Sequence, residues 1–440
     1  MGALRGRPSL AAAVTVLLAC LPAGGADAPA GVDVTASDVA SVLLVAIAAV
    51  VLFTTSRALS PGLGRGTGGW AGRGVLPVRA VVLAPVAGAA ALALLASPDT
   101  LVSLPGFVRF LQVFVLVPLA VLVTVRDRAD VMIVGGALVG AATLQGVIGC
   151  VQVLTGTGAA YGGERVRAVG TFGAPDVMAM ATMVSYGIVI LLGAGLTQRG
   201  RARVLTLAGA GLLCVPLALS LSRGCWIAVL GAALVVVFLR SRVLAARVVL
   251  VVAAAAVLAF ATGTGSDLMD RRLASIASAV SDPDQSVSDR YSLWLAATRM
   301  WAEHPATGVG PRRFGELRDT YAPIELSSGS DTDDPVHGYQ RRPLLSPHNM
   351  YLLTLSEQGL FGLGAFVAFL GSLTWWALRG GVLVAAGLLT CQTISFAYGD
   401  IGGPSTTVMS VALGLALALV AGRRETTAPV EAATPVGAAR

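Results

Sequence analysis

Residues 346–362, SPHNMYLLTLSEQGLFG, join a long polar segment to a membrane-length apolar run. The polar segment covers roughly residues 262–347 and separates the ninth apolar run of the chain from the tenth. His348 and Asn349 stand where the tenth run begins. Such a boundary meets water on one side and lipid on the other, so it suits chemistry on a molecule that is held in the membrane.

The composition of the chain is that of a membrane protein. Of 440 residues, 55% are hydrophobic and 12% are charged, whereas soluble proteins carry about 25% charged residues. The net charge of +7 comes from arginines in short loops between apolar runs, so it indicates topology and no nucleic-acid partner. The five cysteines lie in or beside apolar runs and show no zinc-type spacing with histidine. We therefore expect no metal site and no cofactor.

Twelve apolar runs are long enough to be considered as membrane helices, because a bilayer core needs about 20 apolar residues per helix. Only helices satisfy their backbone groups within such continuous runs. The first run is short, and its end resembles a signal-peptide end. The runs cover approximately residues 9–23, 39–54, 79–96, 107–125, 131–154, 177–196, 203–220, 224–239, 243–261, 350–373, 382–399 and 405–421.

The arginines alternate with these runs as the positive-inside rule requires when the N-terminus is cytoplasmic. The predicted protein is all-α and spans the membrane about twelve times, with one large extracytoplasmic loop that contains an amphipathic helix. Its expected parts are nine helices in residues 1–261, an extracytoplasmic catalytic loop in 262–349, three helices in 350–424 and a disordered cytoplasmic tail in 425–440. Asp38, Asp99 and Asp400 fall in short outer loops.

Some arginines lie on the outer side, against the rule. Arg223 follows Ser222 at the outer junction of two apolar runs, and Arg167 lies in another outer loop. A guanidinium at the membrane boundary is suited to bind phosphate through two hydrogen bonds. The alternative is that Arg223 only reaches the lipid headgroups.

An amphipathic helix is predicted over residues 288–305. Tyr291, Trp294, Leu295 and Thr298 have helical spacing, and aromatic residues suit a helix at the membrane interface. Arg290 lies in the first turn, where it would face the same cavity as Arg223 or, alternatively, only solvent. The stretch 327–334 is expected to be mobile and solvated.

Among three histidines, His304 lies at the end of the amphipathic helix as an expected C-terminal cap, His337 lies in the polar stretch expected to be mobile, and His348 begins a membrane helix. Imidazole is well suited to take a proton near neutral pH. His348 is thus a candidate general base, and a structural cap at the helix start is the alternative. Asn349 stands beside it, and Glu357 follows two and a half turns later.

Four sequence pieces together resemble the bacterial O-antigen ligase/polymerase superfamily. They are Ser222-Arg223-Gly224, the Arg290-Tyr291 piece, residues 304–314 and residues 347–362. The similarity covers roughly residues 165–400. Residues 174–176 depart from the family's usual pattern, which leaves the role of that loop open.

This resemblance implies a GT-C-like membrane fold and an inverting, metal-independent glycosyltransferase. The donor would be a glycan on undecaprenyl pyrophosphate, and the acceptor a glycan or lipid at the outer face of the cytoplasmic membrane. By the match, His348 is the catalytic base, while Arg223 and Arg290 bind the pyrophosphate. Arg167, Asn349 and Glu357 are the further substrate-binding candidates.

Other functions stay open at this point. Ligase and polymerase activities share these motifs, so the sequence does not separate them. A flippase or transporter of lipid-linked saccharides would place ionisable groups near the bilayer midplane, whereas here the charges gather at the outer boundary. A non-catalytic assembly protein is a third possibility.

The topology generates a first prediction. With single cysteines at positions 328 and 426, an impermeant thiol reagent added to intact cells should label position 328 and spare position 426. The chain with only its five native cysteines is the control. Labelling at 426 without labelling at 328 would reverse the orientation.

Overall fold

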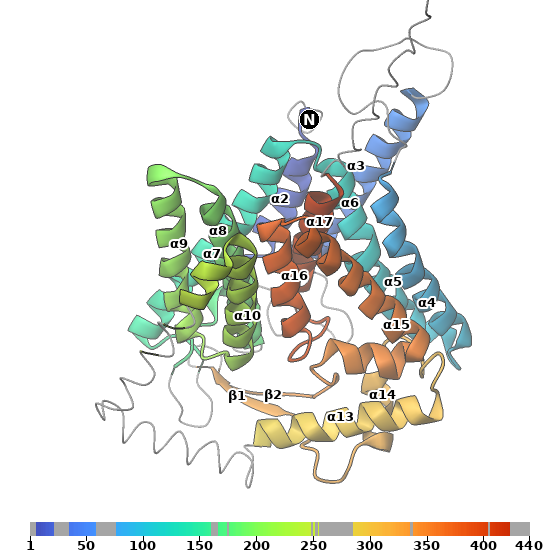
Figure 1. Cartoon of the computed structure of the whole chain (residues 1–440). Helices are drawn as coiled ribbons and strands as arrows, with labels where there is room; N and C mark the ends of the chain where they lie inside the picture. Colours follow the sequence, from blue (N-terminus) through green and yellow to red (C-terminus); the bar gives the residue numbers. More distant parts are fainter. Residues whose placement is uncertain are drawn as a thin grey trace, which may run out of the picture.

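The computed structural model describes residues 6–21, 35–58, 76–159, 166–173, 176–247, 250, 254, 285–334, 338–403 and 405–422. In these residues the chain forms a bundle of helices, with a layer of shorter elements across one end (Figure 1). The layer contains α13 (Gln285–Glu303), α14 (Phe314–Tyr321) and the strands β1 (Ser330–Asp334) and β2 (Gly338–Arg342). The helices of the bundle are α2 (Ser9–Leu18), α3 (Ala36–Ala58), the 3-10 helix η1 (Val78–Val82), α4 (Leu83–Ala96), α5 (Thr100–Leu111), the π-helix η2 (Gln112–Leu116), α6 (Val117–Thr124), α7 (Arg128–Thr155), α8 (Val177–Thr197), α9 (Gly200–Leu219), α10 (Arg223–Arg240), α15 (Met350–Arg379), α16 (Leu383–Ser395) and α17 (Ser405–Ala421).

Most predicted membrane runs coincide with helices. Within the described residues, eight helical spans are long and apolar enough to cross a membrane, and α5, η2 and α6 join into one of them. The shorter apolar helices α2, α16 and α17 match three more runs. The predicted run at 243–261 lies mostly outside the described residues. The described residues therefore form a helical protein of the membrane class, as predicted, with eight candidate membrane spans of full length among them. The predicted total of twelve spans stays a prediction.

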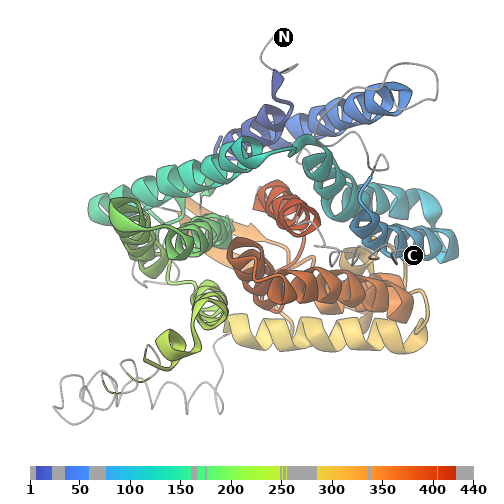
Figure 2. The same ribbon diagram turned by 45° about the horizontal axis from the view of Figure 1, so that its top comes forward.

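Helix α17 lies at the centre of the bundle, surrounded by the other helices (Figure 2). It is buried along almost its whole length, because its sequence is apolar on every side. Gly414 lets α6 approach closely, since a Cβ at this glycine would lie 2.6 Å from the Cβ of Val121. Small residues commonly allow such close contacts between membrane helices.

The predicted inner loops meet one another at helix ends. Arg7, before α2, pairs with Asp127 at the start of α7 (2.9 Å), and Arg126 donates to the carbonyl oxygen of Gly6 (2.7 Å). Arg240, which ends α10, donates through Nε to the carbonyl oxygen of Leu196 in α8 (3.0 Å). The turn between α8 and α9 lies at the end of the bundle opposite α13 (Figure 1).

The amphipathic helix is present as α13. On its predicted apolar face, Tyr291 is 60% exposed and Leu295 is 42% exposed, so these side chains do not pack into the protein. The buried face lies one step around the helix, and it contains Asp289, Ser292, Leu293, Ala296, Ala297 and Met300. The small alanines allow α13 to pack closely on neighbouring elements, which the larger aromatic side chains would not.

The stretch predicted to be mobile and solvated contains a strand instead. Residues of β1 pair with β2 in an antiparallel hairpin, and the register joins Ser330 to Arg342 and Asp334 to Gly338. Backbone pairing requires no alternation of apolar side chains, so the polar sequence concealed this hairpin.

Helix α15 breaks at Gly359, and this break docks the loop that follows α13. Gly359 has φ 65° and ψ −162°, so residues 350–358 and 360–379 form two helical parts. The N–H groups of Val309 and Gly310 donate to the carbonyl oxygens of Ser356 and Glu357, over 2.9 and 3.0 Å. Further along, the N–H of Leu360 donates to the carbonyl oxygen of Pro305 (2.9 Å). The backbone groups freed by the break are thus satisfied by the loop.

Replacing Gly359 should therefore loosen the docked layer. In Gly359→Ala the new Cβ would lie 2.3 Å from the carbonyl carbon and oxygen of Ala306, and alanine is strained at positive φ by roughly 1–3 kcal/mol. We expect a lower melting temperature of the detergent-solubilised protein. Gly364→Ala is the matched control in the same helix, because its Cβ would meet nothing within 4 Å. Equal melting temperatures for the two variants would contradict this account.

Candidate functional site

The start of α15 is held by the loop that joins α16 to α17. The described part of this loop, residues 396–403, is called the α16–α17 loop below. The N–H of Met350 is shared by the carbonyl oxygens of Phe396 (2.8 Å) and Gly399 (3.1 Å). Asn349 caps the helix, because its Oδ1 accepts hydrogen bonds from the N–H groups of Tyr351 (3.0 Å) and Leu352 (3.1 Å). The start of α15 is therefore held both by the α16–α17 loop and by its own cap residue, Asn349.

His348 precedes this cap in a strained conformation. Its φ is 48°, in the left-handed region that side chains other than glycine rarely adopt. The residue is half-buried. Such backbone strain is kept where the surrounding structure imposes it, and it often occurs at functional sites. The shared bond of Met350 and the cap of Asn349 supply that surrounding structure.

The start of α10 contacts the same loop. Gly224 lies against the ring of Tyr398, where an added Cβ would be 3.1 Å from Cγ. Leu221, just before this helix, has φ 53°, so the chain turns sharply before Arg223. The side chain of Arg223 is exposed. The helix starts that carry Arg223 and His348 thus both pack against the α16–α17 loop.

Arg290 reaches the loop from α13. Trp294, one turn further along, donates through Nε1 to the carbonyl oxygen of Pro347 (2.9 Å), which ties α13 to the residue before His348. Burial lowers the pKa of the Arg290 guanidinium, and the charge of Asp400 opposes this effect. The charge of Asp400 therefore acts on Arg290 from the α16–α17 loop.

Asp400, in a predicted outer loop, is a further candidate site residue that its sequence position alone did not indicate. Its Oδ2 is buried and makes no hydrogen bond within the described part of the chain. It interacts electrostatically with Arg290 and with Glu357. Its place as an acidic residue in a short loop between two apolar runs was the only sequence signal for Asp400. The residues that it acts on, Arg290 and Glu357, come from distant segments of the chain.

Arg167 lies in a loop held by two glutamines of α7. Gln152 Oε1 accepts from the N–H of Gly170 (2.8 Å), and Gln145 Oε1 accepts from the N–H of Thr171 (2.9 Å). The N–H of Ala168 donates to the carbonyl oxygen of Leu219 (3.1 Å). Arg167 is thereby placed near the turn that leads into Arg223.

Glu357 is buried at the break in α15. Its Oε1 accepts a hydrogen bond from the N–H of Phe314 (3.1 Å), and the backbone of Arg312 also contributes. Both contacts join Glu357 to the backbone of the loop that follows α13, so the carboxylate holds this loop against α15. His304 is exposed after α13, whereas His337 lies outside the described residues.

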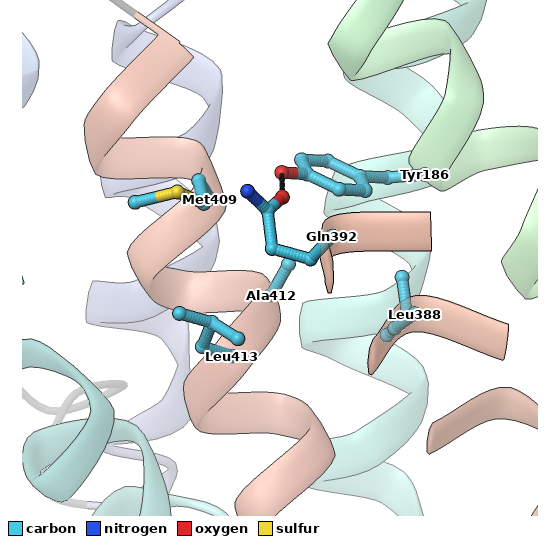
Figure 3. A pocket seen from close by; sticks show the side chains of 6 residues that line it. All are labelled: Tyr186, Leu388, Gln392, Met409, Ala412 and Leu413. Atoms are coloured by element: carbon cyan, nitrogen blue, oxygen red, sulfur yellow. Dashed lines mark hydrogen bonds between the residues drawn. The ribbon is translucent and has the colours of Figure 1, made fainter. Parts of the chain in front are cut away.

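Both flanks of the α16–α17 loop are anchored inside the bundle. On α16, Gln392 Oε1 accepts a hydrogen bond from the hydroxyl of Tyr186 beside a small enclosed gap (Figure 3). On α17, Thr407 Oγ1 donates to Asp38 Oδ1 (3.0 Å), and Asp38 also pairs with Arg109 (2.5 Å). Polar contacts of this kind fix helices relative to one another in lipid.

Residues 208–367 match the family model described as O-Antigen ligase (Wzy_C). These residues form an O-antigen ligase domain. The match begins in α9 and ends in α15, so it contains Arg223, Arg290 and His348. No curated protein matches the chain. Arg167 and Asp400 lie outside the matched residues, although the fold brings their loops to the O-antigen ligase domain.

The contacts of Asp400 generate a prediction for the ligase domain. In Asp400→Asn, Arg290 loses a negative charge that opposes the effect of its burial, so we expect glycan transfer to fall about ten- to a hundredfold, the effect of roughly 1.4–2.7 kcal/mol. The control is Asp99→Asn. Asp99 caps α5 by accepting from the N–H groups of Leu101 and Val102, and asparagine can accept the same bonds. Equal activity of the two variants would remove Asp400 from the site.

Proposed function

We propose that this protein transfers a glycan from an undecaprenyl-pyrophosphate-linked donor to a saccharide or lipid acceptor at the outer face of the cytoplasmic membrane. The observation that carries the proposal is the contact of the α16–α17 loop with Gly224, next to Arg223, and with Met350, two residues after His348, together with the electrostatic effect of Asp400 in this loop on Arg290. The family match over residues 208–367 supports ligation or polymerisation of lipid-linked glycans.

In the proposed reaction, His348 acts as the general base. It takes the proton of an acceptor hydroxyl while the hydroxyl oxygen attacks the anomeric carbon of the donor sugar. The bond from that carbon to the pyrophosphate oxygen breaks, and the electron pair leaves with undecaprenyl pyrophosphate. Attack opposite the leaving group inverts the anomeric configuration. A base that is correctly placed typically contributes 10²–10⁴-fold in rate, as an order of magnitude.

Arg223 and Arg290 would bind the pyrophosphate and stabilise the charge that develops on it. Guanidinium groups fit phosphate oxygens through parallel hydrogen bonds, and fixed positive charges at the leaving group stabilise the transition state. With the charge supplied by arginine, the reaction needs no divalent metal. Asp400 would orient Arg290, and Arg167 would add positive charge at the edge of the site.

Asn349 and Glu357 take a supporting part in this proposal. The Oδ1 of Asn349 and the Oε1 of Glu357 each accept backbone hydrogen bonds, which suits residues that hold the site in shape. Their direct contact with substrate stays a prediction. The arginine alternation in the sequence supports an extracytoplasmic site, because α13 lies at the end of the bundle opposite the α8–α9 turn, which belongs to a predicted inner loop.

The proposal predicts that His348→Ala lowers glycan transfer by about 10²–10⁴-fold. The measurement uses purified protein in liposomes, with a defined undecaprenyl-pyrophosphate-linked glycan and EDTA in the buffer. His337→Ala and His304→Ala are the matched controls and should stay active, because neither is assigned to the site.

Three results would count against the mechanism. A fully active His348→Ala would remove the base. Loss of activity in EDTA that magnesium or manganese restores would transfer the role of the arginines to a metal. Movement of the lipid-linked glycan across the bilayer with no new glycosidic bond would favour the flippase alternative.

A further inference from the structure

The second half of α7 carries its polar side chains on the face that points into the protein. Gln145, Gly149 and Gln152 share one helix face, since they follow the spacing i, i+4, i+7. Gln145 is fully buried and Gln152 is half-buried. The opposite face is apolar and exposed, and it consists of Val147, Val151 and Leu154. Polar side chains within a membrane span are costly and usually have a function, so the inward direction of the two glutamines calls for one.

Both glutamines use their amide groups to hold residues 166–173, called the 166–173 loop below. Gln152 Oε1 accepts a hydrogen bond from the N–H of Gly170 (2.8 Å), and its Nε2 donates to the carbonyl oxygen of the same residue (2.8 Å). Gln145 Oε1 accepts from the N–H of Thr171 (2.9 Å), and its Nε2 donates to Thr171 Oγ1 (2.7 Å). Acceptor and donor atoms of each amide are therefore both bound to the loop.

The 166–173 loop is re-entrant, because it turns back along α7 instead of staying beyond its end. Gly149 lets the loop approach, since an added Cβ there would lie 2.9 Å from the Cβ of Ala168. Gly149 lies six residues before Thr155, the end of α7, or about 9 Å at a rise of 1.5 Å per residue. The opposite face of α7 exposes apolar side chains as far as Leu154. At such a depth, backbone outside helices is tolerated only where protein buries it or where it lines a polar cavity.

The same loop fixes the backbone of Arg167. The N–H of Arg167 donates to the carbonyl oxygen of Ala159 (2.7 Å), and the N–H of Ala159 donates back to Arg167 (3.1 Å). The N–H of Ala168 donates to the carbonyl oxygen of Leu219, which ends α9 four residues before Arg223. The two glutamines therefore hold a loop that brings Arg167 to the turn leading into Arg223.

We propose that Gln145 and Gln152 are positioning residues of the donor site, which hold the 166–173 loop so that Arg167 contributes to binding of the donor pyrophosphate. The inference rests on the proposed function, in which Arg167 adds positive charge at the edge of the site. The glutamines act through the loop backbone and touch no substrate. Hydrogen bonds from guanidinium to phosphate depend on direction as well as charge, so a loosened loop weakens donor binding although Arg167 keeps its charge.

The test removes the amide groups and keeps the length of the side chains. Gln145→Met and Gln152→Met lose the hydrogen bonds to the loop, and each is also combined with Arg167→Gln. Gln198→Met is the matched control. Gln198 also uses its amide, because its Oε1 accepts from Thr206 Oγ1 (2.8 Å), but it lies in the α8–α9 turn at the opposite end of the bundle (Figure 1).

The measured quantity is the affinity for undecaprenyl pyrophosphate that carries no glycan, from its displacement of a fluorescent polyisoprenoid pyrophosphate. We expect Arg167→Gln and each glutamine variant to bind about tenfold more weakly, the equivalent of roughly 1.4 kcal/mol, and the control to bind as the wild type does. With Arg167→Gln present, either glutamine substitution should cost less than about threefold more, because residues that act through one another are not additive.

Three results would overturn the inference. One is a further tenfold loss when a glutamine substitution is added to Arg167→Gln, which would show a general effect on the fold. The second is unchanged affinity in both glutamine variants, and the third is an equal loss in Gln198→Met. Either glutamine variant that inserts normally, with the melting temperature of the wild type, is sufficient for the comparison.

The binding measurement also separates this inference from the proposed reaction. A wild-type protein that binds undecaprenyl pyrophosphate but forms no glycosidic bond would contradict the reaction and leave the role of the glutamines intact. A wild type that transfers glycan while the substitutions remain additive would contradict only the inference. A wild type with no affinity for undecaprenyl pyrophosphate would contradict both.

Discussion

The shared hydrogen bond from the N–H of Met350 to Phe396 and Gly399 connects the parts of the site. It fixes the start of α15 against the α16–α17 loop, and with it the strained His348. The same loop contacts the start of α10 through Tyr398 and acts on Arg290 through the charge of Asp400. This loop therefore links the starts of α10, α13 and α15, which lie far apart in the sequence.

The loop can do this because both of its flanking helices are anchored in the bundle. Tyr186 holds α16 through Gln392, and Asp38 holds α17 through Thr407. Hydrogen bonds between helices stabilise membrane proteins because lipid offers polar groups no alternative partner. Because α17 is central and buried, one flank of the α16–α17 loop belongs to the protein core.

The break at Gly359 divides α15 into two functional parts. Residues 350–358 begin directly after His348 and Asn349 and receive the docked loop, whereas residues 360–379 form the longer second part, which is part of a candidate membrane span. Because one helix supplies both parts, the proposed base and the candidate membrane span are held in a fixed relation. This geometry suits an enzyme whose donor is anchored in the bilayer and whose reacting bond lies at its surface.

The sequence alone determined the membrane class, most of the helices, α13 and the candidates His348, Arg223 and Arg290, because apolar length, arginine alternation and local motifs are properties of short segments. The tertiary structure decided the buried face of α13, the hairpin of β1 and β2, the partners of Glu357 and the place of Asp400. These depend on contacts between residues far apart in the chain. A helix with two possible packing faces, or a loop aspartate with no local partner, acquires its role only when a distant surface is brought against it.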